Sequence, residues 1–103
     1  METVNIKGGS EKQNAWANKI AQEWLSEMNS EIENVELRQD VETVKWFLDN
    51  LYVAKQKLLG GFEKIDAKAL IDMYVAKRTP VKALIEEALR DHQEKHSGGN
   101  YNV

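Results

Sequence analysis

Apolar residues return at every third or fourth position along most of this chain, which is the spacing of amphipathic α-helices. The first stretch places its large apolar side chains at four-residue steps: Trp16, Ile20, Trp24 and Met28. Ser10 stands before this stretch as an N-cap, and Gln13 completes a capping box. We therefore predict a first helix over about residues 11–28. A second capping box, from Ser30 to Glu33, predicts that this helix ends near residue 30.

The second apolar stripe alternates steps of four and three residues, which is typical of a heptad seam. Its members are Leu37, Val41, Val44, Leu48, Leu51 and Leu58. This spacing predicts a helix over about residues 31–59, ended by the glycine pair Gly60 and Gly61. Because such a helix would be about 43 Å long at ~1.5 Å per residue, a kink or a start near Glu36 remains an alternative.

Two shorter helices complete the pattern. Asp66 is placed to cap a third helix over about residues 67–78, and Thr79 followed by Pro80 is a typical start for a fourth. The whole pattern predicts an all-α protein, a small bundle of about four helices, with the last two packed as a hairpin across the first two. We expect one helical domain over residues 10–96, a tail or short strand over residues 1–9, and a mobile C-terminal tail over residues 97–103.

Composition places the chain among soluble globular domains. Its 103 residues are 42% hydrophobic and 30% charged, which suits one domain with a modest core. The absence of cysteine excludes disulfides, thiolate catalysis and cysteine-ligated zinc. No apolar run approaches the roughly 18 residues of a membrane span, and the first residues lack the apolar core of a secretory signal. We expect a cytoplasmic protein with no membrane partner.

Acidic residues gather in the middle of the chain, although the net charge is only −3. Between residues 23 and 49, eight acidic residues stand against Arg38 and Lys45. Direct nucleic-acid binding needs a clustered positive surface and is therefore not expected. The acidic run is either a solvated helix face, the usual meaning of such a run, or a carboxylate surface that occupies the basic groove of a partner.

The three tryptophans are candidates for either core or partner contact. Trp16 lies on the apolar stripe and is expected in the core. Trp24 and Trp46 could serve either purpose, because Trp46 and Phe47 are consecutive and point about 100° apart on a helix. Exposed aromatic side chains are favoured as hot spots of protein interfaces. The candidate partner-binding residues are Trp24, Glu27, Glu31, Asp40, Glu42 and Trp46.

No motif for catalysis or cofactor binding stands out. His92 and His96 would share a helix face as two metal ligands can, but they lie in a polar terminal segment without a third ligand, so we expect no metal site. Glu86 and Glu87 are adjacent on a charged face, and nothing places either near a buried acid partner. No nucleophile setting or phosphate loop is present. We expect no enzyme, no cofactor and no small-molecule substrate.

Two alternative functions follow from other parts of the sequence. The segment AKRTPVKALIEEALRDH, residues 76–92, resembles the second helix of ribbon-helix-helix repressors, which implies a dimeric DNA-binding regulator with a two-stranded ribbon in the major groove. The preceding GFEKID, residues 61–66, would have to form that ribbon, and it offers only Lys64 as a basic contact. The heptad seam, in turn, would allow a homodimer or an accessory subunit that assembles through it.

A second resemblance covers about half of the chain. The segments GSEKQNAWANKI, residues 9–20, and KWFLDN, residues 45–50, resemble a module of small phage and plasmid proteins with the pattern G-[ST]-E-K-Q-x-x-W-A-x-x-I followed by W-[WF]-[IL]-D-N. The module has no established activity and implies no catalytic residue. It implies a setting in which short proteins disable host defence, anti-CRISPR proteins among them. We therefore expect a non-enzymatic inhibitor that binds a host protein or ribonucleoprotein with a basic groove, such as a CRISPR effector nuclease.

Overall fold

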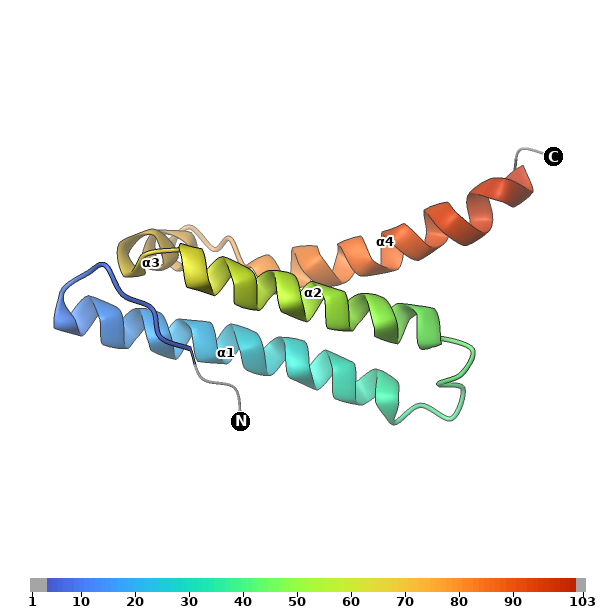
Figure 1. Cartoon of the computed structure of the whole chain (residues 1–103), viewed down its shortest axis with the longest axis horizontal. Helices are drawn as coiled ribbons and strands as arrows, with labels where there is room; N and C mark the ends of the chain where they lie inside the picture. The colour runs from blue at the N-terminus through green and yellow to red at the C-terminus, as the bar shows by residue number, and fades with distance from the viewer. Residues whose placement is uncertain (1–3, 102–103) are drawn as a thin grey trace.

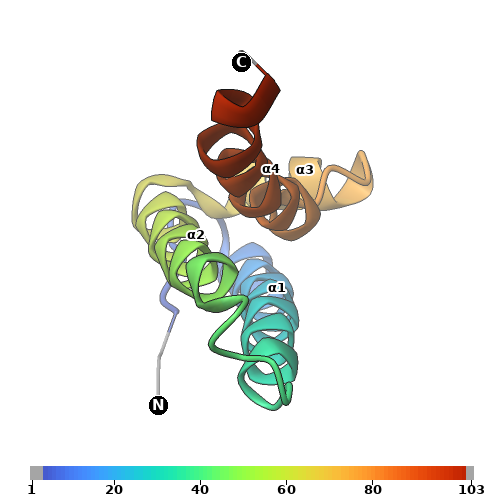
Figure 2. The same cartoon turned by 90° about the vertical axis from the view of Figure 1, so that its right-hand side faces the viewer.

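The computed structural model describes residues 4–101, with side chains described as far as residue 90, and contains four helices within them. They are α1 (Glu11–Glu36), α2 (Lys45–Lys64), α3 (Ala67–Val75) and α4 (Pro80–Tyr101). The long helices α1 and α2 lie side by side and run in opposite directions (Figure 1). Viewed end-on, α4 lies across α2, and the short α3 packs against α1 (Figure 2). The predicted all-α bundle of four helices is confirmed. The predicted hairpin of the last two helices is wrong, because α3 packs against α1 and α4 packs against α2 and α1, and within the described residues the two do not pack against each other.

The start of α1 follows the predicted capping box. The Gln13 backbone N–H donates to Ser10 Oγ at 3.2 Å, and the Ser10 N–H donates to Gln13 Oε1 at 2.9 Å. Residues 4–9 were expected as a tail or a short strand, and they form neither. They run along the bundle as an extended segment whose Ile6 side chain is buried in the core. Residues 1–3 lie outside the described residues.

The break between the first two helices does not fall where the sequence predicted it. α1 continues past Ser30 to Glu36, because Ile32 and Val35 extend its buried stripe by two further turns. Burial of an amphipathic face outweighs a local capping signal of this kind. The chain then turns over residues 37–44, so the predicted helix over residues 31–59 is wrong.

The glycine pair does not end α2. Gly60 and Gly61 lie within the helix, which continues to Lys64. Phe62 is buried beside them, so tertiary packing holds this turn helical despite the low helix propensity of glycine. Two residues of the predicted heptad seam, Leu51 and Leu58, are buried inside the bundle.

The second half of the chain agrees more closely with its predicted elements. Asp66 caps α3, its Oδ1 accepting from the Ala69 N–H at 2.8 Å, but α3 ends at Val75 and not near residue 78. α4 begins at Pro80 as predicted and continues through Tyr101, where a tail was expected from residue 97. The mobility expected of that tail stays a prediction, and residues 102–103 lie outside the described residues.

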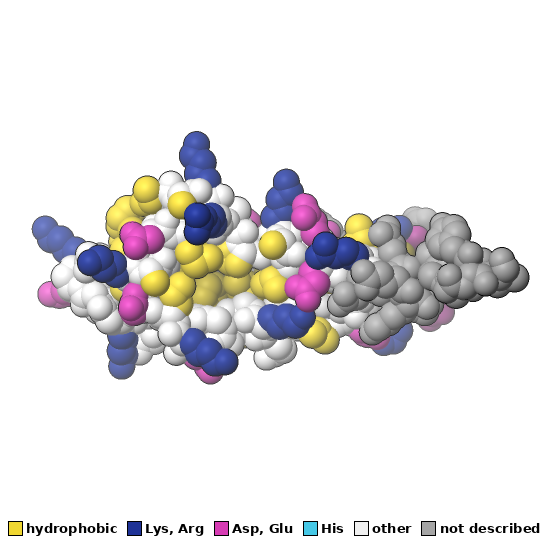
Figure 3. Space-filling view, turned by 90° about the horizontal axis from the view of Figure 1, so that it is seen from above, with side chains coloured by type: hydrophobic (Ala, Val, Ile, Leu, Met, Phe, Trp, Pro, Cys, Tyr) yellow, Lys and Arg dark blue, Asp and Glu magenta, His cyan; other side chains and the backbone are white. Residues whose placement is uncertain are grey.

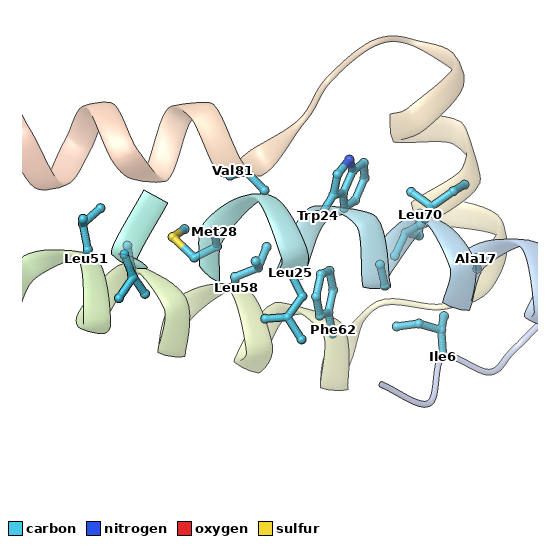
Figure 4. Packing of buried hydrophobic residues seen from close by; sticks show 14 of the residues in the cluster. Ile6, Ala17, Trp24, Leu25, Met28, Leu51, Leu58, Phe62, Leu70 and Val81 are labelled. Atoms are coloured by element: carbon cyan, nitrogen blue, oxygen red, sulfur yellow. The ribbon is translucent and has the colours of Figure 1, made fainter. Parts of the chain in front are cut away.

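The core lies where α1, α2 and α4 meet, and it reaches α3 at one end (Figure 4). Trp24 of α1 and Phe62 of α2 stack at its centre, with ring centroids 6.4 Å apart and an interplanar angle of 16°. Asn50 joins α2 to α4, because its side-chain amide donates to the Ala88 carbonyl at 3.1 Å. Within the described chain, no helix is both long enough and apolar enough to cross a membrane.

Candidate interaction surface

The two tryptophans of α1 differ sharply in burial. Trp24, for which the sequence left core and partner contact open, is only 5% exposed and belongs to the core. Trp16, which was expected in the core, is 45% exposed, so that prediction is wrong. Each four-residue step advances about 40° around a helix, so Trp16 points about 80° away from Trp24. Phe62 of α2 covers Trp24, and only the edge of α3 lies beside Trp16.

Trp16 belongs to an exposed aromatic patch, which we define as Trp16, Tyr74 and Val75. The Trp16 and Tyr74 rings meet edge to face, with centroids 6.1 Å apart and an interplanar angle of 76°. Tyr74 and Val75 are 44% and 65% exposed at the C-terminal end of α3. The Trp16 and Tyr74 side chains each combine apolar area with a polar group, and interface hot spots favour such side chains.

Tyr74 and Val75 are absent from the candidates that the sequence supplied, because helical spacing places both on the apolar face of α3 together with Leu70 and Ile71. The signal that could have found them is the width of that face. Val75 lies about 140° around the helix from the buried Leu70, so a single nine-residue helix could not bury both against one neighbour.

One of the predicted acidic residues, Glu27, lies beside the aromatic patch. Glu27 lines a surface hollow of about 450 Å³ together with Tyr74 and Val75. Helical spacing places Glu23 and Glu27 on the same side of α1 as Trp16, with Glu31 one turn further along. We call Glu23, Glu27 and Glu31 the acidic stripe. Lys77 and Arg78 also line the hollow, so charges of both signs border it.

The remaining candidates lie at the other end of the bundle. Asp40 and Glu42 belong to the turn after α1, and Trp46 lies in the first turn of α2, half-buried with its ring 5.4 Å from that of Phe47. The end of α1 is about 14 Å along the helix axis from Glu27, at ~1.5 Å per residue. The six predicted residues therefore divide between the core, the acidic stripe and this far end, and they form no single site.

The Asp40 carboxylate already has a partner in the chain. Arg38 Nε and Nη2 donate to its two oxygens at 2.8 and 2.7 Å. Hydrogen bonding from this guanidinium lowers the pKa of Asp40 below its usual range. Because both groups are exposed, the pair is a surface feature, and it offsets the charge that Asp40 would otherwise present to a basic partner.

The described side chains form no cluster of metal ligands. No group of three His, Cys, Asp or Glu residues there could hold a metal ion. The pKa of Tyr52 is raised, because partial burial of its phenol disfavours ionisation and the Glu36 carboxylate adds to the effect. This contact lies on the surface between α1 and α2. His92 and His96 lie outside the residues whose side chains are described.

Comparison with protein-family models, curated proteins and solved structures gives no match for this chain.

Proposed function

We propose that this chain is a non-enzymatic inhibitor that binds a host nucleic-acid-handling defence complex through the aromatic patch and the acidic stripe. The observation that carries the proposal is that the two features adjoin at one surface hollow. Glu27 borders the same hollow as Tyr74 and Val75, and Tyr74 in turn contacts Trp16. An apolar anchor beside several carboxylates suits a partner that offers an apolar pocket on a basic surface.

The two features would contribute differently to binding. Burying Trp16, Tyr74 and Val75 would remove apolar area from water and slow dissociation. The acidic stripe would attract a positive surface, which mainly increases the rate of association and makes that rate sensitive to salt. A nuclease that holds nucleic acid in a basic groove presents such a surface.

The proposed setting is a phage or a mobile element, by the resemblance of residues 9–20 and 45–50 to the module described above. Several matching residues have structural roles in this chain. Ser10 and Gln13 cap α1, and Asn50 of α2 forms a hydrogen bond with α4. Trp16 is the matching aromatic that is exposed. It is therefore the residue of the module for which we propose partner contact.

The two alternative functions gain less support. A ribbon-helix-helix regulator needs a strand within residues 61–66, and residues 61–64 are helical here as the end of α2. An assembly subunit needs a free heptad seam, and Leu51 and Leu58 of that seam are already buried in the bundle. We therefore retain the protein-binding inhibitor as the proposal.

A cleavage assay tests the proposal directly. The purified chain is titrated into a purified CRISPR effector nuclease from a Gram-positive bacterium, and cleavage of its target DNA is followed. We expect inhibition by the wild-type chain, weaker inhibition by Trp16→Ala with Tyr74→Ala, and slower association by Glu27→Lys with Glu31→Lys.

Matched controls separate surface effects from unfolding. Glu33→Lys with Glu63→Lys makes the same charge change at exposed positions away from the acidic stripe, and it should leave inhibition unchanged. Free duplex DNA should not bind the chain at any salt concentration tested. Salt-sensitive binding to free DNA, or equal loss of inhibition in both charge-reversed variants, would contradict the proposal.

A further inference from the structure

A second surface hollow, separate from the aromatic patch, lies between the C-terminal half of α2, α3 and the start of α4. We call it the apolar groove, and its volume is about 380 Å³. Figure 3 shows this face from above, with hydrophobic side chains on the floor of the hollow and Lys and Arg side chains around it, interspersed with Asp and Glu. The floor consists of core residues that the start of α4 does not cover: Trp24, Leu58, Phe62, Ile65, Leu70 and Met73.

The chemistry of the lining favours a protein segment over a small molecule. Sites for small ligands combine apolar walls with a few converging polar groups that orient the ligand. Here the charged side chain of the lining is Lys57, and its Nζ already binds Glu87 Oε1 at 3.0 Å. An extended apolar groove with a charged rim is instead the arrangement that receives the apolar face of an amphipathic helix.

Gly61 lines the α2 side of the apolar groove and has no side chain to fill it. It lies within α2, where glycine costs about 1 kcal/mol relative to alanine. Apart from the neighbouring backbone of α2 itself, no atom of the described chain lies within 4 Å of where its Cβ would be, so packing inside the bundle does not require glycine there. A glycine at this position lets the backbone of a docked segment approach α2 closely. Gly60 is equally open, but it borders a different hollow, beside Val4 and Leu59.

The charges around the groove indicate which kind of helix would fit. Lys64 lies on the same face of α2 as Lys57 and Gly61, and Lys77 and Arg78 line the adjoining hollow on the other side of Trp24. These three cations are exposed, and none has an ion pair within the described side chains. Glu27 also lines that adjoining hollow, so the three cations are accompanied by one carboxylate. A docked segment would meet a rim with a net positive charge, which acidic residues complement.

We infer that the apolar groove docks one amphipathic α-helix of a partner protein, with acidic residues flanking the apolar face of that helix. This inference goes beyond the proposed inhibitor function, because it uses the opposite charge and does not involve Trp16 or Val75. It gives the chain a second binding surface, with a positive rim where the acidic stripe is negative.

Two synthetic peptides test the inference with the full-length chain. Both carry leucines at helical spacing on one face, one with glutamates and the other with lysines beside that face. Fluorescence anisotropy of the labelled peptides measures their affinities. We expect the glutamate peptide to bind roughly tenfold tighter at low salt, with a smaller difference at high salt. Lys64→Glu with Arg78→Glu should remove or reverse this preference.

The two glycines supply a matched pair of variants. Gly61→Leu fills the groove and should weaken binding of the glutamate peptide by roughly tenfold or more. Gly60→Leu makes the same change one residue away and should leave that affinity unchanged. Both variants replace a helical glycine at an open position, so both should remain folded. The cleavage assay should not distinguish them, which separates this inference from the proposed function.

Three outcomes would overturn the inference. Equal affinity of the two peptides would show that the rim does not select charge, and equal effects of the two glycine variants would place binding outside the groove. A wild-type dimer by light scattering that Gly61→Leu converts to a monomer would make a second copy of the chain the occupant.

Discussion

Asn18 binds both backbone polar groups of Ile6. The Ile6 N–H donates to Asn18 Oδ1 at 2.7 Å, and Asn18 Nδ2 donates to the Ile6 carbonyl at 3.1 Å. The same Nδ2 also donates to the Asn14 carbonyl at 2.7 Å. One side chain of α1 thereby holds the N-terminal segment in place, so that the Ile6 side chain can enter the core.

Asn18→Ala should release this segment. We expect the free energy of unfolding to fall by about 2 kcal/mol, since two partly buried hydrogen bonds to Ile6 are lost at ~1 kcal/mol each. Urea denaturation measures the change, and hydrogen exchange should show faster exchange of the Ile6 amide. The exposed Asn5 provides the control, because Asn5→Ala should change stability by less than about 0.5 kcal/mol. Unchanged exchange at Ile6 in Asn18→Ala would contradict the assignment.

Alanine should have opposite effects at two glycines. Gly8 has φ of +97°, and a Cβ there would lie 2.6 Å from Asp66 Cβ. Gly8→Ala should therefore destabilise the protein by about 2 kcal/mol or more. Gly60→Ala, in open space on a helix, should stabilise it by about 1 kcal/mol. Thermal denaturation of both variants checks the signs, and a shift of the same sign in both would count against the described backbone.

The two tryptophans of α1 should differ in their contribution to stability. Trp24→Ala removes a buried ring that stacks on Phe62 and should cost about 3–5 kcal/mol. Trp16→Ala removes a half-exposed ring and its edge contact with Tyr74, and it should cost about 1 kcal/mol. Urea denaturation monitored by circular dichroism gives both values. Iodide should quench less of the fluorescence in Trp16→Phe than in the wild type, and a reversed order of the two costs would exclude this arrangement.

An NMR titration should show that the Arg38–Asp40 pair lowers the pKa of the Asp40 carboxyl group. Because Arg38 donates to both oxygens of Asp40, the carboxyl should titrate below the ordinary aspartate value of about 3.9. A lowered folded-state pKa stabilises the protein above the unfolded-state value, and this contribution is lost as pH falls through the folded-state pKa. The protein should therefore lose this contribution to its stability below about pH 4. Arg38→Gln should return the Asp40 pKa to the ordinary range, with Lys45→Gln as the control that leaves it unchanged.

Helix identity could be predicted from the sequence wherever a local signal and burial agreed. Ser10 with Gln13, Asp66, and Pro80 each began a helix where the sequence placed one, because capping depends on a few neighbouring atoms. The signals at Ser30 and Gly60 were just as local, but there the buried faces of α1 and α2 continued through them. Tertiary burial decided those two positions, since each buried apolar side chain contributes more than a cap.

The candidate surface depended on tertiary structure to a greater extent. Periodicity by itself determined that Trp16 and Trp24 would lie on one broad stripe of a helix. It could not determine which neighbour would cover which end of that stripe, and α2 reached Trp24 while α3 reached only the edge of Trp16. The acidic residues were likewise visible as a run along the chain, but the turn over residues 37–44 paired Asp40 with Arg38 and left Glu27 beside Tyr74. Sequence determined which side chains were available, and the packing of the four helices decided which of them face water.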